Sequence, residues 1–301
     1  LGFRAAAALA PLEKCGLTDD SKADFCPMPT NSFRNSIYAE DCIRGMQQHL
    51  PDESVDVIVT SPPYNIGVRY GTYHDERPFE EYLDWMEQLA EECCRVMKEN
   101  GSFFFNIGDK PSDELRSLEV ARRVTRHFHL QNTIHWVKSI AAPEKNVNIG
   151  HYKPVNSPRF LNNAHEYIFH FTRTGRVKLD KLAIGVSYQD KSNVGRWKKA
   201  QQDCRDRGNM WFIPYATVQS EKEHPAAFPP RLAEMCIRLH GLTDERLVVL
   251  DPFLGSGSTA VAARECGCDY VGFEVDPDYV DLVRDKLAQQ KLDWNTGKPR
   301  S

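Results

Sequence analysis

Hydrophobic residues recur along the chain in two alternating patterns, and each pattern predicts a different element. Short runs rich in β-branched and aromatic residues predict strands, whereas apolar positions three or four residues apart predict amphipathic helices. The predicted strands are 36–39, 55–59, 102–106, 131–138, 165–171, 247–250 and 269–274. The predicted helices are 42–49, 78–100, 115–128, 231–240, a helix ending at 264, and 277–289. Because strands and helices alternate, we predict an α/β fold built on a doubly wound, mostly parallel sheet.

The same pattern divides the 301 residues into five segments. Residues 1–33 show no sustained periodicity and are expected to form a flexible tail, and residues 293–301 form a C-terminal tail. Segments 34–137 and 224–292 carry the periodic elements of two halves of one domain. Between them, residues 138–223 are rich in proline and polar residues and are expected to form an insert. No apolar run reaches the roughly 18 residues that span a bilayer, so no membrane-spanning segment is expected.

The stretch Thr60-Ser61-Pro62-Pro63-Tyr64-Asn65 directly follows the predicted strand 55–59. Neither proline has an N–H to donate to a ladder, so the strand must stop and the backbone must leave the sheet at Ser61. The carboxyl ends of strands are where open α/β folds bind their ligands. Taken alone, the stretch is equally compatible with a simple turn that ends a strand.

A second turn, residues 251–259 with the sequence DPFLGSGST, follows the predicted strand 247–250. Its glycines allow a tight turn and a close approach of the backbone to a ligand. Glu274 ends the next strand, where it can accept hydrogen bonds from two ribose hydroxyls. The turn lacks a dinucleotide glycine pattern and a phosphate-binding lysine, and its first residue, Asp251, favours a cationic ligand. These features fit S-adenosylmethionine better than NAD or ATP.

Charge is distributed unevenly along the chain. The net charge is −4, yet residues 138–208 hold 14 basic and 6 acidic side chains. A basic segment on an acidic body indicates a localised contact with a polyanion. A basic face that compensates acidic neighbours is the alternative.

The cysteines and histidines do not form a recognisable metal site. Nine cysteines are scattered without a usual metal-binding spacing, which predicts reduced thiols in an intracellular protein and no structural metal. The expected location is the cytoplasm or nucleoid, or the nucleus in a eukaryote. His165 and His170 lie in a predicted strand that places them on opposite faces, unlike the zinc-binding pair of a helix.

Over about residues 35–290 the chain resembles the β-class S-adenosylmethionine-dependent DNA amino-methyltransferases. The resemblance rests on two motifs in a fixed order, TSPPYN first and DPFLGSGST later along the chain. Residues 222–229, KEHPAAFP, resemble the block that lines the methionine end of the cofactor in that family. Residues 39–42, AEDC, resemble the short motif whose acid contacts the adenine ring. The resemblance implies a Rossmann-like methyltransferase fold with permuted motif order and a target-recognition segment at the basic stretch.

The resemblance also implies roles for individual residues. The Ser61 hydroxyl and the Pro62 carbonyl would accept hydrogen bonds from an exocyclic amine, while Tyr64 stacks on a base flipped out of the duplex. The implied catalytic residues are Ser61, Pro62, Pro63 and Tyr64. The implied cofactor-binding residues are Asp41, Thr60, His224, Phe228, Asp251, Phe253, Gly255, Ser256, Gly257, Thr259 and Glu274. The expected DNA contacts are Arg159, Arg173, Arg176, Arg196, Lys198 and Lys199.

The residue before Pro-Pro-Tyr bears on the choice of base. Ser61 resembles the N4-cytosine subgroup, whereas aspartate is commoner in N6-adenine enzymes. The resemblance therefore implies site-specific methyl transfer to cytosine N4 in double-stranded DNA, as in restriction-modification, with N6-adenine as the nearest alternative. An RNA or protein amino-methyltransferase and a non-catalytic nucleic-acid-binding subunit are further alternatives. A homodimer is left open.

Overall fold

The computed structural model describes residues 32–67, 69–70, 73–152, 154–194, 203–214 and 228–296. The strands of its main sheet are β1 Ser36–Tyr38, β2 Val55–Thr60, β5 Met97–Ile107, β6 His129–Val137, β9 His165–Thr172, β10 Met210–Phe212, β11 Val248–Asp251 and β12 Asp269–Phe273. Their order across the sheet is β1-β12-β11-β2-β5-β9-β6-β10. All run parallel except β9, which is antiparallel to both of its neighbours. The predicted mostly parallel α/β sheet is confirmed.

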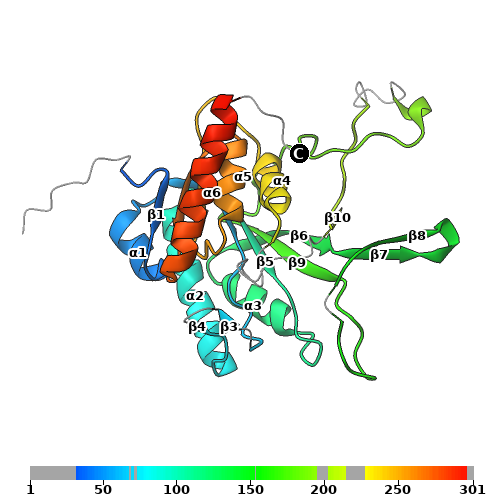
Figure 1. The fold of residues 1–301 in the computed structure, drawn as a ribbon, viewed down its shortest axis with the longest axis horizontal. Coiled ribbons are helices and arrows are strands. Elements are labelled where there is room, and N and C mark those ends of the chain that lie inside the picture. The colour runs from blue at the N-terminus through cyan, green and yellow to red at the C-terminus, as the bar shows by residue number, and fades with distance from the viewer. Residues whose placement is uncertain are drawn as a thin grey trace, which may run out of the picture. The chain divides into compact units, whose positions relative to one another are not determined.

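Helices cover both faces of this sheet. Helices α1 Cys42–His49, α2 Phe79–Val96 and α3 Arg116–Val124 share one apolar cluster with it. Helices α4 Pro230–His240, α5 Ser258–Glu265 and α6 Pro277–Thr296 pack on the other face, where Figure 1 shows them together in yellow to red. Within the described ranges, each helix is too short or too polar to cross a lipid bilayer.

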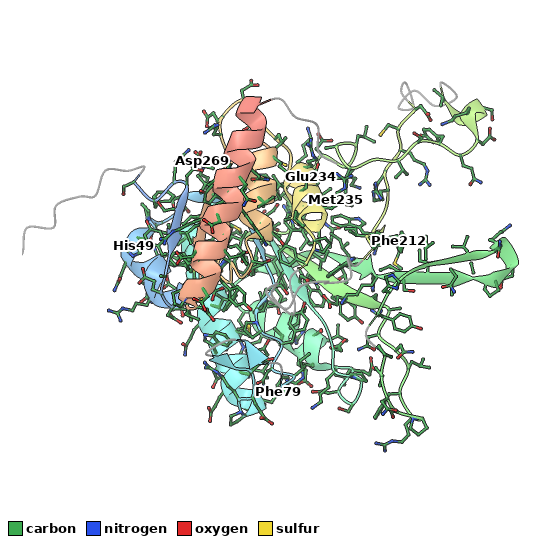
Figure 2. All side chains as sticks on the ribbon, viewed as in Figure 1. His49, Phe79, Phe212, Glu234, Met235 and Asp269 are labelled. Atoms are coloured by element: carbon green, nitrogen blue, oxygen red, sulfur yellow. The ribbon has the colours of Figure 1, made fainter. Side chains whose placement is uncertain are left out.

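Alternation along the central strands explains why both faces need helices. Phe103 and Phe105 of β5 belong to the cluster under α1–α3, whereas Phe104 belongs to the cluster under α4 and α5. Successive residues of a strand point to opposite faces, so a run of phenylalanines makes both faces apolar. On α4, Met235 is buried against this sheet, whereas the neighbouring Glu234 forms ion pairs with two arginines of its own helix (Figure 2).

The expected end of the long second helix is wrong. Helix α2 ends at Val96, and the Asn100-Gly101 pair lies inside β5. A Cβ on Gly101 would lie 3.0 Å from the Asp56 carbonyl oxygen of the neighbouring strand and 2.4 Å from Met97 Cγ. The glycine therefore permits a close approach of two strands and does not cap a helix.

The segment expected to be an insert is partly built into the sheet, because β9 and β10 both lie within residues 138–223. A hairpin of β7 Ser139–Ala142 and β8 Val147–Gly150 projects from the sheet (Figure 1). Its strands are joined through the 3-10 turn η1 Pro143–Lys145. A second small pair, β3 Arg69–Tyr70 and β4 Tyr73–His74, follows the proline turn, and a 3-10 turn η2 spans Lys191–Asn193.

Strand direction assigns each connection to one of two edges. We call the edge where β1, β2, β5, β11 and β12 end the carboxyl edge, and the opposite one the amino edge. Because β9 is antiparallel, it starts at the carboxyl edge and ends at the amino edge. Residues 138–164, before β9, therefore lie at the carboxyl edge. Residues from 173 onward leave β9 at the amino edge.

Candidate active site

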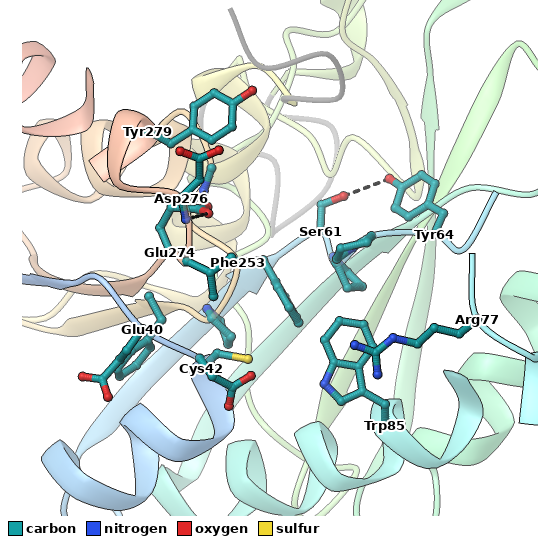
Figure 3. Close-up of a pocket in the computed structure, with 17 residues that line it drawn as sticks. Glu40, Cys42, Ser61, Tyr64, Arg77, Trp85, Phe253, Glu274, Asp276 and Tyr279 are labelled. Atoms are coloured by element: carbon teal, nitrogen blue, oxygen red, sulfur yellow. Dashed lines mark hydrogen bonds between the residues drawn. The ribbon is translucent and has the colours of Figure 1, made fainter. Parts of the chain in front are cut away.

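A cleft of about 900 Å³, including its open mouth, lies at the carboxyl edge (Figure 3). The segments that follow β1, β2 and β11, together with the end of β12, supply most of its walls, and α2 and α6 add one side chain each. The cleft joins the two motifs that were separate in the sequence. The predicted site residues that line it are Asp41, Ser61, Pro62, Pro63, Tyr64, Phe253, Gly255 and Glu274.

The proline turn is held in place by hydrogen bonds from two directions. Ser61 Oγ lies 2.9 Å from the Tyr64 hydroxyl, the contact drawn dashed in Figure 3. The Tyr64 hydroxyl in turn donates to Glu166 at 2.9 Å. On the other side, the Tyr82 hydroxyl of α2 donates to the Pro63 carbonyl at 2.9 Å. The turn at the end of β2 is therefore fixed to both β9 and α2.

Directly after the turn, Asn65 closes the base of the following loop. Its side chain accepts from the Arg77 N–H at 2.7 Å and donates to the Arg77 carbonyl at 2.9 Å. The backbone N–H groups of Asn65 and Ile66 donate to the buried Asp75 carboxylate at 2.8 and 3.0 Å. This closure brings the Arg77 guanidinium 4.5 Å from the centre of the Trp85 ring, where both side chains line the cleft.

Asp251 does not line the cleft, and the predicted contact between its carboxylate and a cationic ligand is wrong. The side chain is buried, and its two oxygens accept from Thr60 at 2.6 Å and Thr259 at 2.7 Å. The Phe253 N–H adds a third bond at 3.1 Å. Burial raises the pKa of Asp251 to about 6, although these hydrogen bonds act to lower it. The carboxylate therefore links the end of β2 to the glycine turn and α5.

Glu274 reaches the cleft from the end of β12. Its Oε2 accepts from the Gly255 N–H at 2.8 Å, and its Oε1 accepts from the Asp276 N–H at 2.9 Å. Burial raises the pKa of this carboxyl above its usual value. A carboxylate has about four acceptor positions, so acceptor capacity remains for a ligand. Gly257, with φ of +84°, has no room for a Cβ, which would lie 2.6 Å from Val283 Cγ1 of α6.

Other residues predicted to bind the cofactor directly lie in the core. Phe228 is buried in the cluster under α4 and α5, and its carbonyl accepts from Ser258 at 2.7 Å. Thr60 and Thr259 are buried with Asp251, and Ser256 is also buried. These residues support the glycine turn from behind. His224 lies outside the described residues.

Several lining residues were not predicted. Trp85 of α2 lines the cleft, while Tyr82 and Met86 on the same helix are buried. Its ring meets Phe253 edge-on with centroids 5.4 Å apart. Apolar spacing alone gives no signal that separates such a wall residue from the core. Further unpredicted lining residues are Glu40, Cys42, Arg77, Pro252, Phe273, Val275, Asp276 and Tyr279.

The two ends of the cleft differ in charge. Figure 3 shows Glu40, Glu274 and Asp276 on one side of Phe253, with Ser61 and Arg77 on the other. An acidic end suits a cationic ligand, and a serine with a nearby arginine suits a second, polar ligand. Burial raises the pKa of the Cys42 thiol well above its usual range, so this lining cysteine is not a reactive thiolate.

The predicted DNA contacts that the structure describes lie at two different edges of the sheet. Arg159 is exposed in the loop before β9, at the carboxyl edge. Arg173 and Arg176 follow β9 at the amino edge. There the Arg173 guanidinium donates hydrogen bonds to Glu53 Oε1 at 2.5 Å and to the Met97 carbonyl at 3.1 Å. Antiparallel β9 thus carries the chain to the edge opposite the cleft before these two arginines, and their contact with DNA stays a prediction. Arg196, Lys198 and Lys199 lie outside the described residues.

Comparison with known proteins gives consistent matches. A family model described as DNA methylase matches residues 55–285. The chain is 30% identical over 267 residues to the Type II methyltransferase M.BglII of Bacillus subtilis, covering 84% of this chain and 69% of that protein. It is 28% identical over 267 residues to the orphan methyltransferase M.BamHII of Bacillus amyloliquefaciens, covering 80% and 92% of the two chains.

Two solved structures share the fold. The PvuII DNA methyltransferase, described as cytosine-N4-specific, aligns with a TM-score of 0.62 at 22% identity, over 83% of this chain and 85% of that one. A putative DNA modification methylase of Thermus thermophilus, complexed with S-adenosyl-L-methionine, aligns with a TM-score of 0.57 at 24% identity, over 85% and 93%. At these identities the likeness extends to the arrangement of strands and helices.

Proposed function

The chain belongs to the N6/N4 family of DNA methylases, and from that premise we propose that it methylates the exocyclic N4 amine of cytosine in duplex DNA, with S-adenosylmethionine as methyl donor. One observation carries the proposal. Ser61, at the end of β2, and Glu274, at the end of β12, line the same cleft. An acceptor for an amine and an acceptor for ribose hydroxyls thus face one space.

The donor groups of the cleft fit the chemistry of S-adenosylmethionine. Glu274 keeps acceptor capacity for the ribose hydroxyls. Asp41, just before α1, accepts the Arg44 N–H with one carboxylate oxygen, which leaves the other for the adenine amine. Phe253 and Phe273 offer apolar walls. The carboxylates of Glu40, Glu274 and Asp276 at the acidic end favour a positively charged ligand. When bound, the cofactor supplies an electrophilic methyl group.

The residues of the proline turn prepare the target amine. The lone pair of an exocyclic amine is delocalised into its ring, which makes the nitrogen a poor nucleophile. Ser61 Oγ and the Pro62 carbonyl accept the two N–H groups, which favours a pyramidal nitrogen with a localised lone pair. The Pro63 carbonyl is occupied by Tyr82, so Pro62 is the acceptor from this turn. The remaining requirement is orientation, which the rigid turn provides.

The choice of cytosine rests on Ser61. Cytosine N4 and adenine N6 both carry two N–H groups beside a ring acceptor, so two acceptors alone do not discriminate between them. Serine before Pro-Pro-Tyr favours cytosine by resemblance, and the PvuII enzyme of similar fold is described as cytosine-N4-specific. Duplex DNA as substrate requires that the base be flipped out to reach the cleft.

The test is methyl transfer from labelled S-adenosylmethionine to duplex DNA, followed by analysis of the nucleosides. We expect label in N4-methylcytosine. Label only in N6-methyladenine would overturn the base assignment and leave the family activity in place. Parallel reactions with RNA and with protein define the substrate class. Cofactor binding without transfer to any of them would support a non-catalytic nucleic-acid-binding subunit.

A further inference from the structure

A chain of polar groups runs behind the cleft, from Ser61 into the sheet. Ser61 Oγ contacts the Tyr64 hydroxyl at 2.9 Å, and this hydroxyl donates to Glu166 Oε2 at 2.9 Å. Glu166 Oε1 pairs with the ammonium group of Lys138. Glu166 and Lys138 do not line the cleft and are largely buried, with side chains 14% and 17% exposed. Tyr64 connects this ion pair to the Ser61 hydroxyl.

The position of Glu166 is built by its neighbours. The Asn106 amide donates to Glu166 Oε2 at 3.1 Å and to the Tyr167 carbonyl at 3.0 Å, which uses both of its N–H groups. Gly108 lies beside the pair, and a Cβ there would lie 3.0 Å from Glu166 Cγ and 3.1 Å from Tyr64 Cε2. A larger residue at this position would separate the carboxylate from the tyrosine.

The carboxylate determines the direction of the hydrogen bonds. Tyr64 has one proton, and a charged acceptor at 2.9 Å attracts it more strongly than the neutral Asn106 Oδ1 at 3.3 Å. The Tyr64 oxygen can then act toward Ser61 only as an acceptor, so the Ser61 O–H donates to Tyr64. The lone pairs of Ser61 Oγ are left for the cleft.

The opposite direction would hinder the reaction. If Tyr64 donated to Ser61, the serine proton would be free to point into the cleft. There it would hydrogen-bond to the lone pair of the target amine, which is the electron pair that must attack the methyl group. The direction of one hydrogen bond thus decides whether Ser61 supports or opposes the amine as a nucleophile.

We infer that Glu166, held by Lys138, is a positioning residue that keeps Ser61 as a hydrogen-bond acceptor for the target amine. This inference deepens the proposed function and rests on it. Glu166→Gln changes one carboxylate oxygen to an amide and removes the charge that attracts the tyrosine proton. The rate of methyl transfer at saturating cofactor and DNA should fall about 10- to 100-fold. The affinity for S-adenosylmethionine should stay within about twofold, since Glu166 is outside the cleft.

A double-mutant cycle separates positioning from general structural support. In a Tyr64→Phe background the chain is already broken, so Glu166→Gln should cause less than about a twofold further loss. Lys138→Met should repeat the loss seen for Glu166→Gln, and Lys138→Arg should restore most of the rate because it keeps the ion pair. Glu53→Gln is the matched control, since Glu53 pairs with Arg173 at the amino edge. It should leave the rate unchanged.

Each outcome is decisive. If the rate losses of Glu166→Gln and Tyr64→Phe multiply in the double variant, the two residues act independently and the inference is overturned. A loss of rate in the Glu53→Gln control equal to that of Glu166→Gln would also overturn it. If Glu166→Gln fails to fold, the same cycle with Lys138→Met decides. Absence of methyl transfer by the unmodified chain overturns the proposed function and this inference with it. Transfer by the unmodified chain with full rate in Glu166→Gln overturns the inference alone.

Discussion

At the scale of single residues, Ser61 is the side chain on which the chemistry most depends. Ser61→Ala removes one of two proposed acceptors, and we expect methyl transfer to fall by about 10- to 100-fold. Cofactor affinity, measured by calorimetry, should change little because Glu274, the proposed ribose contact, is unaffected. The control is Ser54→Ala, which removes a hydroxyl bonded to Pro51 just before β2 begins. Full activity of Ser61→Ala would mean that the Pro62 carbonyl suffices.

Buried titratable residues make the stability of the protein depend on pH. Burial, with a smaller effect of His240, lowers the pKa of His170 to about 3 from an ordinary value of 6.5. As pH falls, His170 therefore binds a proton in the unfolded chain before it does in the folded protein. The free energy of unfolding thus decreases as pH falls below 6.5. Asp251 acts in the opposite sense, because its pKa is raised from 3.8 to about 6 and stability is lost as pH rises through that window.

Variants at these two positions should change the pH profile in opposite directions. Between pH 7.5 and pH 5, protonation of His170 in the unfolded chain should lower the unfolding free energy of the wild type by about 2 kcal/mol. His170→Gln should flatten this decline, and Asp251→Asn should steepen it, as measured by urea unfolding at both pH values. Parallel profiles for wild type and His170→Gln would show that the neutral His170 does not govern this part of the curve.

Some of these residues could be identified from the sequence and others could not. Ser61, Glu274 and the glycine turn were predictable because each follows a strand in a distinctive local pattern. The role of Asp251 was not, since its hydrogen bond to Thr60 depends on strand pairing between residues 191 positions apart. Glu166 and Arg77 carry no local pattern that marks them as members of the site.

At the scale of elements, helix α2 serves the core and the cleft with adjacent residues. Trp85→Ala should weaken S-adenosylmethionine binding about tenfold, because the ring forms a cleft wall against Phe253. Its effect on unfolding free energy should be smaller than that of Met86→Ala, a fully buried neighbour whose truncation should cost about 2–5 kcal/mol. Equal destabilisation with unchanged affinity would assign Trp85 to the core.

Periodic elements were predicted better than irregular ones. Helix α1 occupies the predicted residues 42–49, where Asp41 caps its first turn. The hairpin β7–β8 and the strand β10 were not predicted, because they lie in the segment rich in proline and polar residues, where no sustained alternation marks a strand. The Asn100-Gly101 pair has the sequence of a helix end, but contacts with β2 place it in a strand.

At the scale of the whole molecule, strand order separates basic residues that are continuous in sequence. Residues 138–164 at the carboxyl edge hold 4 basic side chains and 1 acidic one, whereas residues 173–208 beyond β9 hold 10 and 4. Among the described residues, the first group lies at the edge that holds the cleft. The reversal at β9 could not be read from the sequence, because nothing in its alternation reports strand direction.

This separation predicts different effects of two arginines on DNA binding. Arg159→Ala should weaken duplex binding and lower the slope of log affinity against log salt by about 0.9, the value for one lost phosphate contact. Arg176→Ala, exposed beyond the amino edge, should leave affinity and slope unchanged. Titrations at several salt concentrations measure both. The reverse result would place the duplex at the amino edge.

The position of β12 between β1 and β11 has a consequence for the newly synthesised chain. In the described sheet β1 pairs with β12, so residues 36–38 gain their strand partner only after residues 269–273 have left the ribosome. Contacts across such long separations form slowly compared with local helices. A partly synthesised chain presents the Ser61 turn without the acid that completes its cofactor cleft. Methyltransferase activity is therefore expected only after residues 269–274 have emerged from the ribosome.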